Sequence, residues 1–306
     1  MIKYVKHHFI DKPKYDHCIK LDEHGLTYGF SWYLDTVCES WDALVLNDYD
    51  AVWPLPVRRK FGVKYFFRPF AVQQLGIFSK IVLEDHQYTD FVRAMTEACQ
   101  FADIYLNENQ LVAIADTPGM QTQINRNYLL DINTSYRQIY HGYNTNTRRA
   151  IKKSNEQDLQ IFEHDSPDVL MDLFRHNKGA ELKLSEAFYR SFKKLMFQAL
   201  HRGVGKLWTV YGAGNRICAG AFFLESKSRS TLLFTGLDEV GKSSRAMFFL
   251  LNEYIILHSE KGKLLDFEGS NDAGVARFYQ GFGAREFNYQ QLKYNGLPMP
   301  LRWLKK

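Results

Sequence analysis

Residues 206–238 contain three strand-like runs joined by turns that are too short for a crossover. The runs are 206–212, 216–226 and 229–238, and "AGN" separates the first two. Parallel neighbours need a connection of about a dozen residues, so these turns predict an antiparallel meander. A helix-like run over 243–262, a strand at 263–269, a short helix at 273–283 and a last strand at 285–294 follow. This order predicts a mixed, mostly antiparallel sheet flanked by helices.

The first half of the chain repeats the same order with negligible identity. Strand-like runs at 41–46, 51–60 and 62–75, the last with a break near Pro69, precede a helix at 87–102 and a strand at 103–109. A polar, basic and helix-like segment, 135–157, separates the halves. Since 306 residues suit about two domains, we expect an α/β (α+β) chain divided into 1–145 and 146–306. We also expect the last residues to pack back on the first domain; one large α/β domain is the alternative.

The stretch "GLDEVGKSS", Gly236–Ser244, matches the phosphate loop of nucleotide hydrolases. Too few residues follow it to build a sheet of parallel crossovers, and Asp238 and Glu239 would repel a triphosphate. We therefore expect no nucleotide hydrolysis. A turn that begins a helix still presents backbone N–H groups to an anion. The predicted anion site comprises Gly241, Lys242, Ser243, Ser244 and Arg245.

Composition narrows the class of protein without fixing its substrate. The net charge of +5 mildly favours anionic partners. The four cysteines are far apart in the sequence and predict reduced thiols, and no metal-ligand spacing occurs. The first residues contain no apolar signal core, and no apolar run approaches the ~18 residues of a membrane span. We expect a cytoplasmic protein with no metal and no membrane span.

Three features resemble the Fem peptidyltransferases and their FemX-like relatives, which consist of two GNAT acyltransferase domains in tandem. The first is "LDFEGSNDAGVARFYQGFGA", 265–284, and the second is the basic stretch "NTNTRRAIKKSNEQDLQI". The third is the order of elements in both halves. The positions of the first stretch that fit the family pattern are Asp266, Phe267, Gly269, Gly274, Val275, Phe278, Gly281, Phe282 and Gly283.

The resemblance implies tandem GNAT domains and transfer of an acyl or aminoacyl group to an amine. The implied donor is an acyl-CoA or an aminoacyl-tRNA, with no tightly bound cofactor. The implied acceptor is an amine, for which a nucleotide-linked cell-wall precursor of peptidoglycan is one candidate. Two alternatives stay open: an acyl-CoA-dependent enzyme that acts on a small, lipid or sugar amine without tRNA, and a binding protein that has lost its chemistry. The sequence makes no prediction of oligomeric state.

Two segments depart from the family pattern. "RPFAVQQLGIF" has Arg68 and Pro69 but lacks the aspartate expected near the end of the third strand. "EVGKSSRA" matches the acetyl-CoA loop of GNAT enzymes only in part. The first departure concerns the acceptor and the second concerns the donor.

The candidate site residues follow from what acyl transfer needs. A backbone N–H near Phe234–Gly236 would polarise the donor carbonyl, and Tyr279 would protonate the leaving group. Asp266 or Glu268, which flank Phe267 on a strand, would accept the proton of the amine. The candidate substrate-binding residues are Arg68, Gln73 and Gln74 in the first half, and Arg148, Arg149, Lys152 and Lys153 between the halves. For each residue a structural role is the alternative: packing for the tyrosine, local hydrogen bonding for the carboxylates and capping for the serines. The glutamines could be polar residues of an edge strand, and the basic run could be a solvated helix face.

Overall fold

The computed structural model describes residues 1–108, 110, 117–269 and 271–297. The chain forms two compact units. Unit 1 comprises Met1–Arg126 and the chain from Asn288 onward, and unit 2 comprises Asn127–Phe287. The chain passes from unit 1 to unit 2 after Arg126, earlier than the expected boundary at 145, because the segment 127–145 contributes to the core of unit 2.

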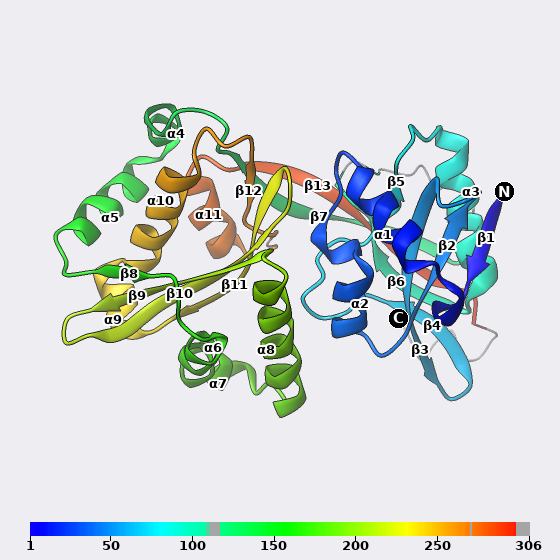
Figure 1. Ribbon diagram of the computed structural model, residues 1–306, viewed down its shortest axis with the longest axis horizontal. Coiled ribbons are helices and arrows are strands. Elements are labelled where there is room, and N and C mark those ends of the chain that lie inside the picture. Colours follow the sequence, from blue (N-terminus) through cyan, green and yellow to red (C-terminus); the bar gives the residue numbers. More distant parts are fainter. Residues whose placement is uncertain (109, 111–116, 270, 298–306) are drawn as a thin grey trace. The chain divides into compact units, whose positions relative to one another are not determined.

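Unit 1 is a mixed sheet with helices on it (Figure 1). Its strands run in the order β1-β2-β3-β4-β6-β13, and β5 pairs with β3. All neighbours are antiparallel except β4 and β6, which α3 connects. Its elements are β1 (Ile2–Val5), α1 (Lys12–Leu21), α2 (Ser31–Val37), β2 (Trp41–Leu46), β3 (Ala51–Lys60), β4 (Val63–Phe67), β5 (Phe78–Ser79), α3 (Asp85–Ala98), β6 (Phe101–Tyr105) and β13 (Arg285–Asn295).

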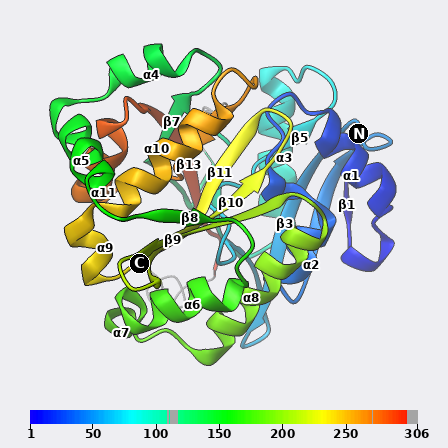
Figure 2. The same ribbon diagram turned by 60° about the vertical axis from the view of Figure 1, so that its left-hand side comes forward.

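Unit 2 repeats this plan with the strand order β7-β12-β11-β10-β9-β8. Its single parallel pair is β11 with β12, connected through α10. Figures 1 and 2 show α10 and α11 on one face of this sheet and α6 and α8 on the other. The elements are β7 (Met120–Asp131), α4 (Tyr136–Gly142), α5 (Thr145–Asn155), β8 (Gln160–Phe162), α6 (Pro167–His176), α7 (Lys178–Leu182), α8 (Glu186–His201), β9 (Gly205–Gly212), β10 (Arg216–Glu225), β11 (Arg229–Leu237), α9 (Glu239–Ser244), α10 (Ala246–His258), β12 (Leu264–Asp266) and α11 (Ala273–Gly281).

The sheet of each unit is completed by a strand from the other half of the sequence. β6 of unit 1 pairs antiparallel with β13, which is the last strand in the described part of the chain. β12 of unit 2 pairs antiparallel with β7, which precedes the second half. The edge beside each parallel pair is thus covered by an exchanged strand.

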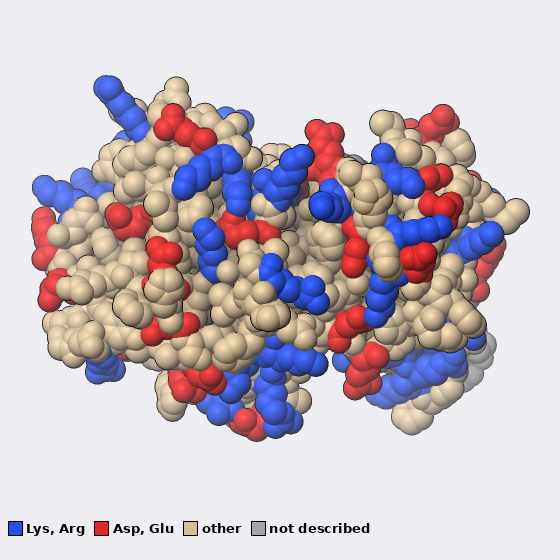
Figure 3. Space-filling view, in the orientation of Figure 1, with Lys and Arg blue, Asp and Glu red and all other residues tan. Residues whose placement is uncertain are grey.

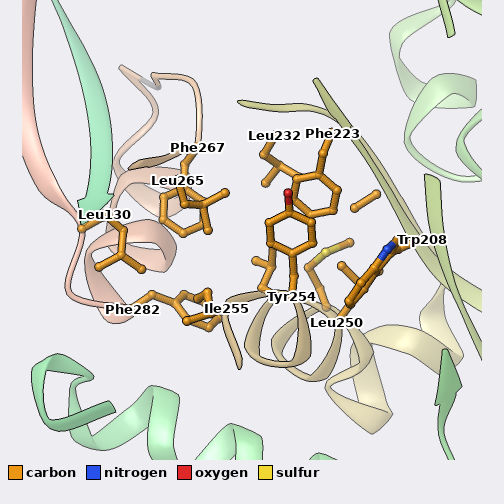
Figure 4. Close-up of a cluster of buried hydrophobic side chains, with 14 of the residues drawn as sticks. Leu130, Trp208, Phe223, Leu232, Leu250, Tyr254, Ile255, Leu265, Phe267 and Phe282 are labelled. Atoms are coloured by element: carbon orange, nitrogen blue, oxygen red, sulfur yellow. The ribbon is translucent and has the colours of Figure 1, made fainter. Parts of the chain in front are cut away.

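The core of unit 2 lies between its sheet and α10 (Figure 4). The sequence of α10, "AMFFLLNEYIILH", is apolar on almost every side, so both faces of the helix must be covered. The sheet covers one face, where Tyr254 stacks on Phe223 with ring centroids 3.7 Å apart. The amphipathic helix α5 packs on α10 and buries Ile151.

Most predicted elements agree with the observed ones to within a few residues at their ends, and two differ further. The strand expected over 62–75 ends at Phe67. The helix expected over 243–262 is two helices, because Arg245 has a left-handed backbone with φ 63° and separates α9 from α10. In the described part of the chain, no helix is both long and apolar enough to cross a membrane.

Candidate active site

Unit 2 contains a cavity of about 360 Å³ between the end of β11 and helix α11. Its wall is mostly apolar and includes two basic residues and a tyrosine. The lining residues are Leu232, Thr235, Leu237, Gly241, Lys242, Arg245, Met247, Phe248, Gly274, Val275, Phe278 and Tyr279.

The cavity lies where β11 and β12 separate. The two strands pair only through Arg229–Thr231 and Leu264–Asp266, and β12 ends there. β11 continues to Leu237, so its last residues have no β12 partner on that edge. An extended ligand could hydrogen-bond to such an edge in the manner of an added strand.

A β-bulge in β11 sets which residues face the cavity. Phe222 of β10 lies opposite Phe234, but Phe223 lies opposite Leu232, so Leu233 is the extra residue. A bulge changes the side on which later residues point. As a result Leu232 and Thr235, three positions apart, both line the cavity.

The side chain of Phe234, and the direction in which a side chain at Gly236 would point, are on the opposite face of the sheet, which α6 and α8 cover. The Phe234 ring centroid is 4.6 Å from that of Phe174 and 4.6 Å from that of Phe192. A Cβ added at Gly236 would lie 2.9 Å from Cδ1 of Leu170. These two positions therefore reach the cavity side only through their backbone.

The start of α9 is already capped by a side chain of the protein. The Asp238 carboxylate, which is buried, accepts a hydrogen bond of 2.7 Å from the backbone N–H of Gly241. The backbone N–H of Lys242 donates to the carbonyl of Asp238 at 2.9 Å. The expectation of free N–H groups in this turn is therefore wrong at Gly241 and Lys242, because Asp238 takes the place that an anion would occupy. Gly241 is still required, since an added Cβ would lie 2.2 Å from the Cys218 carbonyl oxygen.

The serines of the predicted anion site satisfy their own helix. The Ser243 and Ser244 hydroxyls both donate to the carbonyl of Val240, at 2.9 and 2.8 Å. The Lys242 ammonium lies 2.6 Å from a carboxylate oxygen of Glu239, which raises the pKa of Lys242.

Arg245 differs from these residues. Its side chain is exposed, lines the cavity and has no ion pair with a residue in the described ranges. Of the predicted anion site, Arg245 is thus the cation most available to a ligand.

Tyr279 stands in the wall of the cavity and is held by two aromatic rings. Its ring stacks on that of Phe267, with centroids 4.8 Å apart and an interplanar angle of 19°, and its centroid lies 6.3 Å from that of Tyr128. Burial raises the pKa of Tyr279 well above the ordinary value, and the nearby carboxylates of Glu268 and Asp266 raise it further. The hydroxyl is therefore protonated at neutral pH and can donate a hydrogen bond.

Asp266 and Glu268 differ sharply in their surroundings. Asp266 is 1% exposed; its Oδ2 lies 2.8 Å from Arg229 Nη1, and its Oδ1 accepts a 2.9 Å hydrogen bond from the backbone N–H of Glu268. Glu268 is half-buried and has a left-handed backbone with φ 52°. Because β12 ends at Asp266, the strand alternation used in the sequence analysis does not extend to Glu268.

The predicted residues of the first half lie in unit 1, after β4. Gln73 and Gln74 are buried, and their amides hydrogen-bond to each other at 2.8 Å. Oε1 of Gln74 accepts a 2.7 Å hydrogen bond from the Glu108 backbone N–H. Arg68 is exposed, with its guanidinium carbon 4.3 Å from the ring centroid of Tyr105. Of these three, only the arginine has its polar group at the surface.

The basic run lies on α5. Arg149, Lys152 and Lys153 are exposed and Arg148 is half-buried; none of them has an ion pair with a residue that the structure describes. Ile151 and Thr147 of the same helix face inward. The run is an outward basic face of an amphipathic helix.

Sequence reasoning did not find the bulge, Thr235 or Arg229. No local signal marks the bulge, because "STLLFTGL" lacks the alternation whose interruption would locate it. Arg229 is a charged residue at the start of an apolar strand, which is itself an indication of a buried ion pair.

Comparison with known proteins agrees with this geometry. No curated protein matches the sequence. Among solved structures, that of FemX superposes with a TM-score of 0.69, covering 97% of this chain and 98% of that one at 12% identity. A tandem GNAT protein from the clavulanic acid biosynthesis pathway gives a TM-score of 0.56, 97% and 99% coverage and 8% identity. The C-terminal domain of a putative lysylphosphatidylglycerol synthetase from Agrobacterium fabrum gives a TM-score of 0.55, with 86% of each chain covered and 12% identity.

The predicted fold and the resemblance are confirmed by these matches. Residues 142–269, which include β11, the capped turn and α10, match the Acetyltransferase (GNAT) domain. The predicted class of enzyme, an acyltransferase, agrees with that match. The chain thus has a fold similar to that of FemX and to that of a tandem GNAT protein, and residues 142–269 of its second half match an acetyltransferase (GNAT) domain.

Proposed function

We propose that the protein transfers an acyl or aminoacyl group to an amine, with the donor bound in the cavity of unit 2. The observation that carries this proposal is the combination found there among the described residues: an edge of β11 that β12 leaves unpaired, Arg245 without an ion pair, and a protonated tyrosine around one cavity. Each of these features has a use in acyl transfer, and together they lie in the domain that matches GNAT acetyltransferases.

The chemistry is a substitution at the donor carbonyl. The amine nitrogen attacks the carbonyl carbon, the bond to the leaving sulfur or oxygen breaks, and the amine loses a proton. Backbone N–H groups of β11 near the bulge would stabilise the developing oxyanion. The Tyr279 hydroxyl would donate its proton, or a hydrogen bond, to the leaving atom.

Glu268 is the better candidate for accepting the amine proton. Both carboxylate oxygens of Asp266 already have partners, and the side chain is 1% exposed, so an amine cannot approach it. Glu268 is half-buried and close enough to Tyr279 to raise the pKa of that hydroxyl. We therefore assign Asp266 to structure and Glu268 to proton transfer.

An acyl-CoA is the donor that the cavity favours. An extended thioester arm fits a mostly apolar cavity beside a free strand edge, and Arg245 would meet a phosphate. Calorimetric titration with acetyl-CoA and with free CoA tests this. Binding at micromolar concentrations that weakens about ten-fold in Arg245→Ala supports the proposal. No binding of either compound, at low or high salt, removes this donor class.

An aminoacyl-tRNA is the second candidate, on account of the unpaired basic face of α5. Contacts with phosphates release counterions, so the affinity would fall steeply with salt, whereas that for an acyl-CoA would fall slightly. Titration of aminoacyl-tRNA at two salt concentrations, with wild type and with Lys152→Gln/Lys153→Gln, separates the two donors. A salt slope reduced by about two in the double variant supports tRNA.

The acceptor is an amine, and a nucleotide-linked cell-wall precursor belongs on the panel of acceptors to be tested. This choice rests on the resemblance of the motifs to Fem peptidyltransferases. Arg68 is the residue of the predicted acceptor set whose charged group is accessible. A panel of small, sugar and peptide amines, followed by mass spectrometry of the products, would identify the acceptor class.

A further inference from the structure

The β3–β4 hairpin of unit 1 has an aromatic residue at its tip. β3 ends at Lys60 and β4 begins at Val63, so Phe61 and Gly62 form a two-residue loop. Both have positive φ, 51° and 77°, as in a type I′ turn. Asn, Asp and Gly are the usual residues at the first of these positions.

Phe61 gains nothing from packing at this position. Its side chain is 94% exposed, although a left-handed backbone is unfavourable for a bulky residue. Strained residues that the fold does not need indicate a function elsewhere. A fully exposed Phe at a strained turn is therefore a candidate contact with something outside the chain.

Basic side chains surround this tip. Arg58, Arg59 and Lys60 are exposed, and none has an ion pair with a described residue. The Lys60 ammonium lies 5.5 Å from the Phe61 ring centroid, and the Arg58 guanidinium carbon lies 4.1 Å from that of Phe67. In Figure 1 the hairpin projects from unit 1, and in Figure 3 Lys and Arg atoms gather over it at the lower right.

We propose that this hairpin docks unit 1 on an anionic phospholipid surface. Phe61 would enter the interfacial region, where an aromatic ring is favoured, while Arg59 and Lys60 pair with lipid phosphates. Cations alone would suit any polyanion, but the apolar tip suits a surface that has both negative charge and hydrocarbon. This surface is in unit 1, and the inference does not depend on the acyl transfer proposed for unit 2.

Vesicle binding by the full chain tests the proposal. We expect the protein to sediment with vesicles of phosphatidylcholine and phosphatidylglycerol at 50 mM salt, and to bind pure phosphatidylcholine vesicles much less. Phe61→Asn should weaken binding about ten-fold, from loss of the buried ring. Asn-Gly is the preferred type I′ pair, so this variant should fold at least as well as wild type. Val82→Asn, at a site that is also 94% exposed, is the matched control and should bind as wild type does.

A charge-matched pair of double variants tests the cations. Arg59→Gln/Lys60→Gln should weaken vesicle binding about 25-fold, at about five-fold for each cation near an anionic surface. Lys227→Gln/Lys261→Gln removes the same charge from two exposed lysines of unit 2 and should change vesicle binding less than two-fold. Equal losses in both double variants, unchanged vesicle binding in Phe61→Asn, or binding of heparin or short RNA in place of vesicles would each overturn the proposal.

Discussion

Nη1 of Arg229 lies 2.8 Å from Oδ2 of Asp266, and the two side chains are 8% and 1% exposed. The ion pair joins the first paired residue of β11 to the last paired residue of β12, after which the two strands separate. The other oxygen of Asp266 fixes the backbone of Glu268, and Phe267 between them stacks on Tyr279. The pair therefore positions the groups proposed to act on the donor.

Removal of one charge from this pair should cost stability. Asp266→Asn removes the negative charge that lies 2.8 Å from the buried Arg229 guanidinium, and we expect the free energy of unfolding to fall by about 3 kcal/mol. Urea unfolding measures it. Arg229→Met/Asp266→Leu removes both charges and should recover most of the loss. Equal stability of Asp266→Asn and wild type would mean that the pair has no structural role.

Tyr279→Phe should reduce turnover and leave donor binding nearly unchanged. The ring keeps its stacking on Phe267, and only the hydroxyl is lost, so kcat should fall ~10²-fold or more. Tyr140→Phe, a half-buried tyrosine of α4 outside the cavity, is the control. Full activity of Tyr279→Phe would assign this residue to packing.

The raised pKa of Tyr279 has a consequence for the pH profile. The hydroxyl loses its proton only above the ordinary value of about 10, so the wild-type kcat should not decline through this group between pH 7 and 10. A decline in kcat in this range that is absent from Tyr279→Phe would contradict the assignment.

Arg245→Ala should weaken donor binding about ten-fold, because it removes a charged hydrogen-bond donor from the cavity. Lys242→Ala should have a smaller effect, since Glu239 already pairs with Lys242, and Glu239→Gln should tighten binding by releasing that lysine. Calorimetry gives the three dissociation constants. Arg277→Ala, an exposed arginine of α11 outside the cavity, controls for net charge. If Arg277→Ala weakened donor binding as much as Arg245→Ala does, donor binding would depend only on the net charge of the protein.

Gly241→Ala should destabilise unit 2 by about 2–3 kcal/mol or prevent folding. The added Cβ would meet the backbone carbonyl of Cys218 at 2.2 Å, and backbone cannot move aside as a side chain can. Gly142→Ala, at a helical position with nothing within 4 Å, should be neutral or stabilising. The midpoints of thermal unfolding compare the two. An unfolding midpoint for Gly241→Ala as high as that for Gly142→Ala would show that α9 can shift away from β10.

The strands and the fold were predictable because local pattern determines them. The runs 41–46 and 51–60 coincide with β2 and β3, since apolar residues bounded by turn residues leave little choice. The helices α6 and α8 were not assigned, although Ser166-Pro167 is a recognisable helix start. A search for caps over 160–201 would have found it.

The details of the site were not predictable because they depend on tertiary pairing. The bulge at Leu233 exists only relative to β10, and the use of Asp238 as a cap depends on where β11 ends. Arg245 in a left-handed conformation contradicts its propensity, so no sequence rule places the break between α9 and α10 there.

The exchange of β7 and β13 affects how the protein folds while it is being synthesised. The first half leaves the ribosome with one edge of β6 unpaired, because its partner on that edge is β13, the last strand in the described part of the chain. At ordinary rates of translation this edge waits on the order of ten seconds for its partner, open to pairing with other nascent chains. A single cut in the chain therefore cannot release each unit with its complete sheet. A chain that stops after Phe287 should aggregate through unit 1 even when unit 2 is intact.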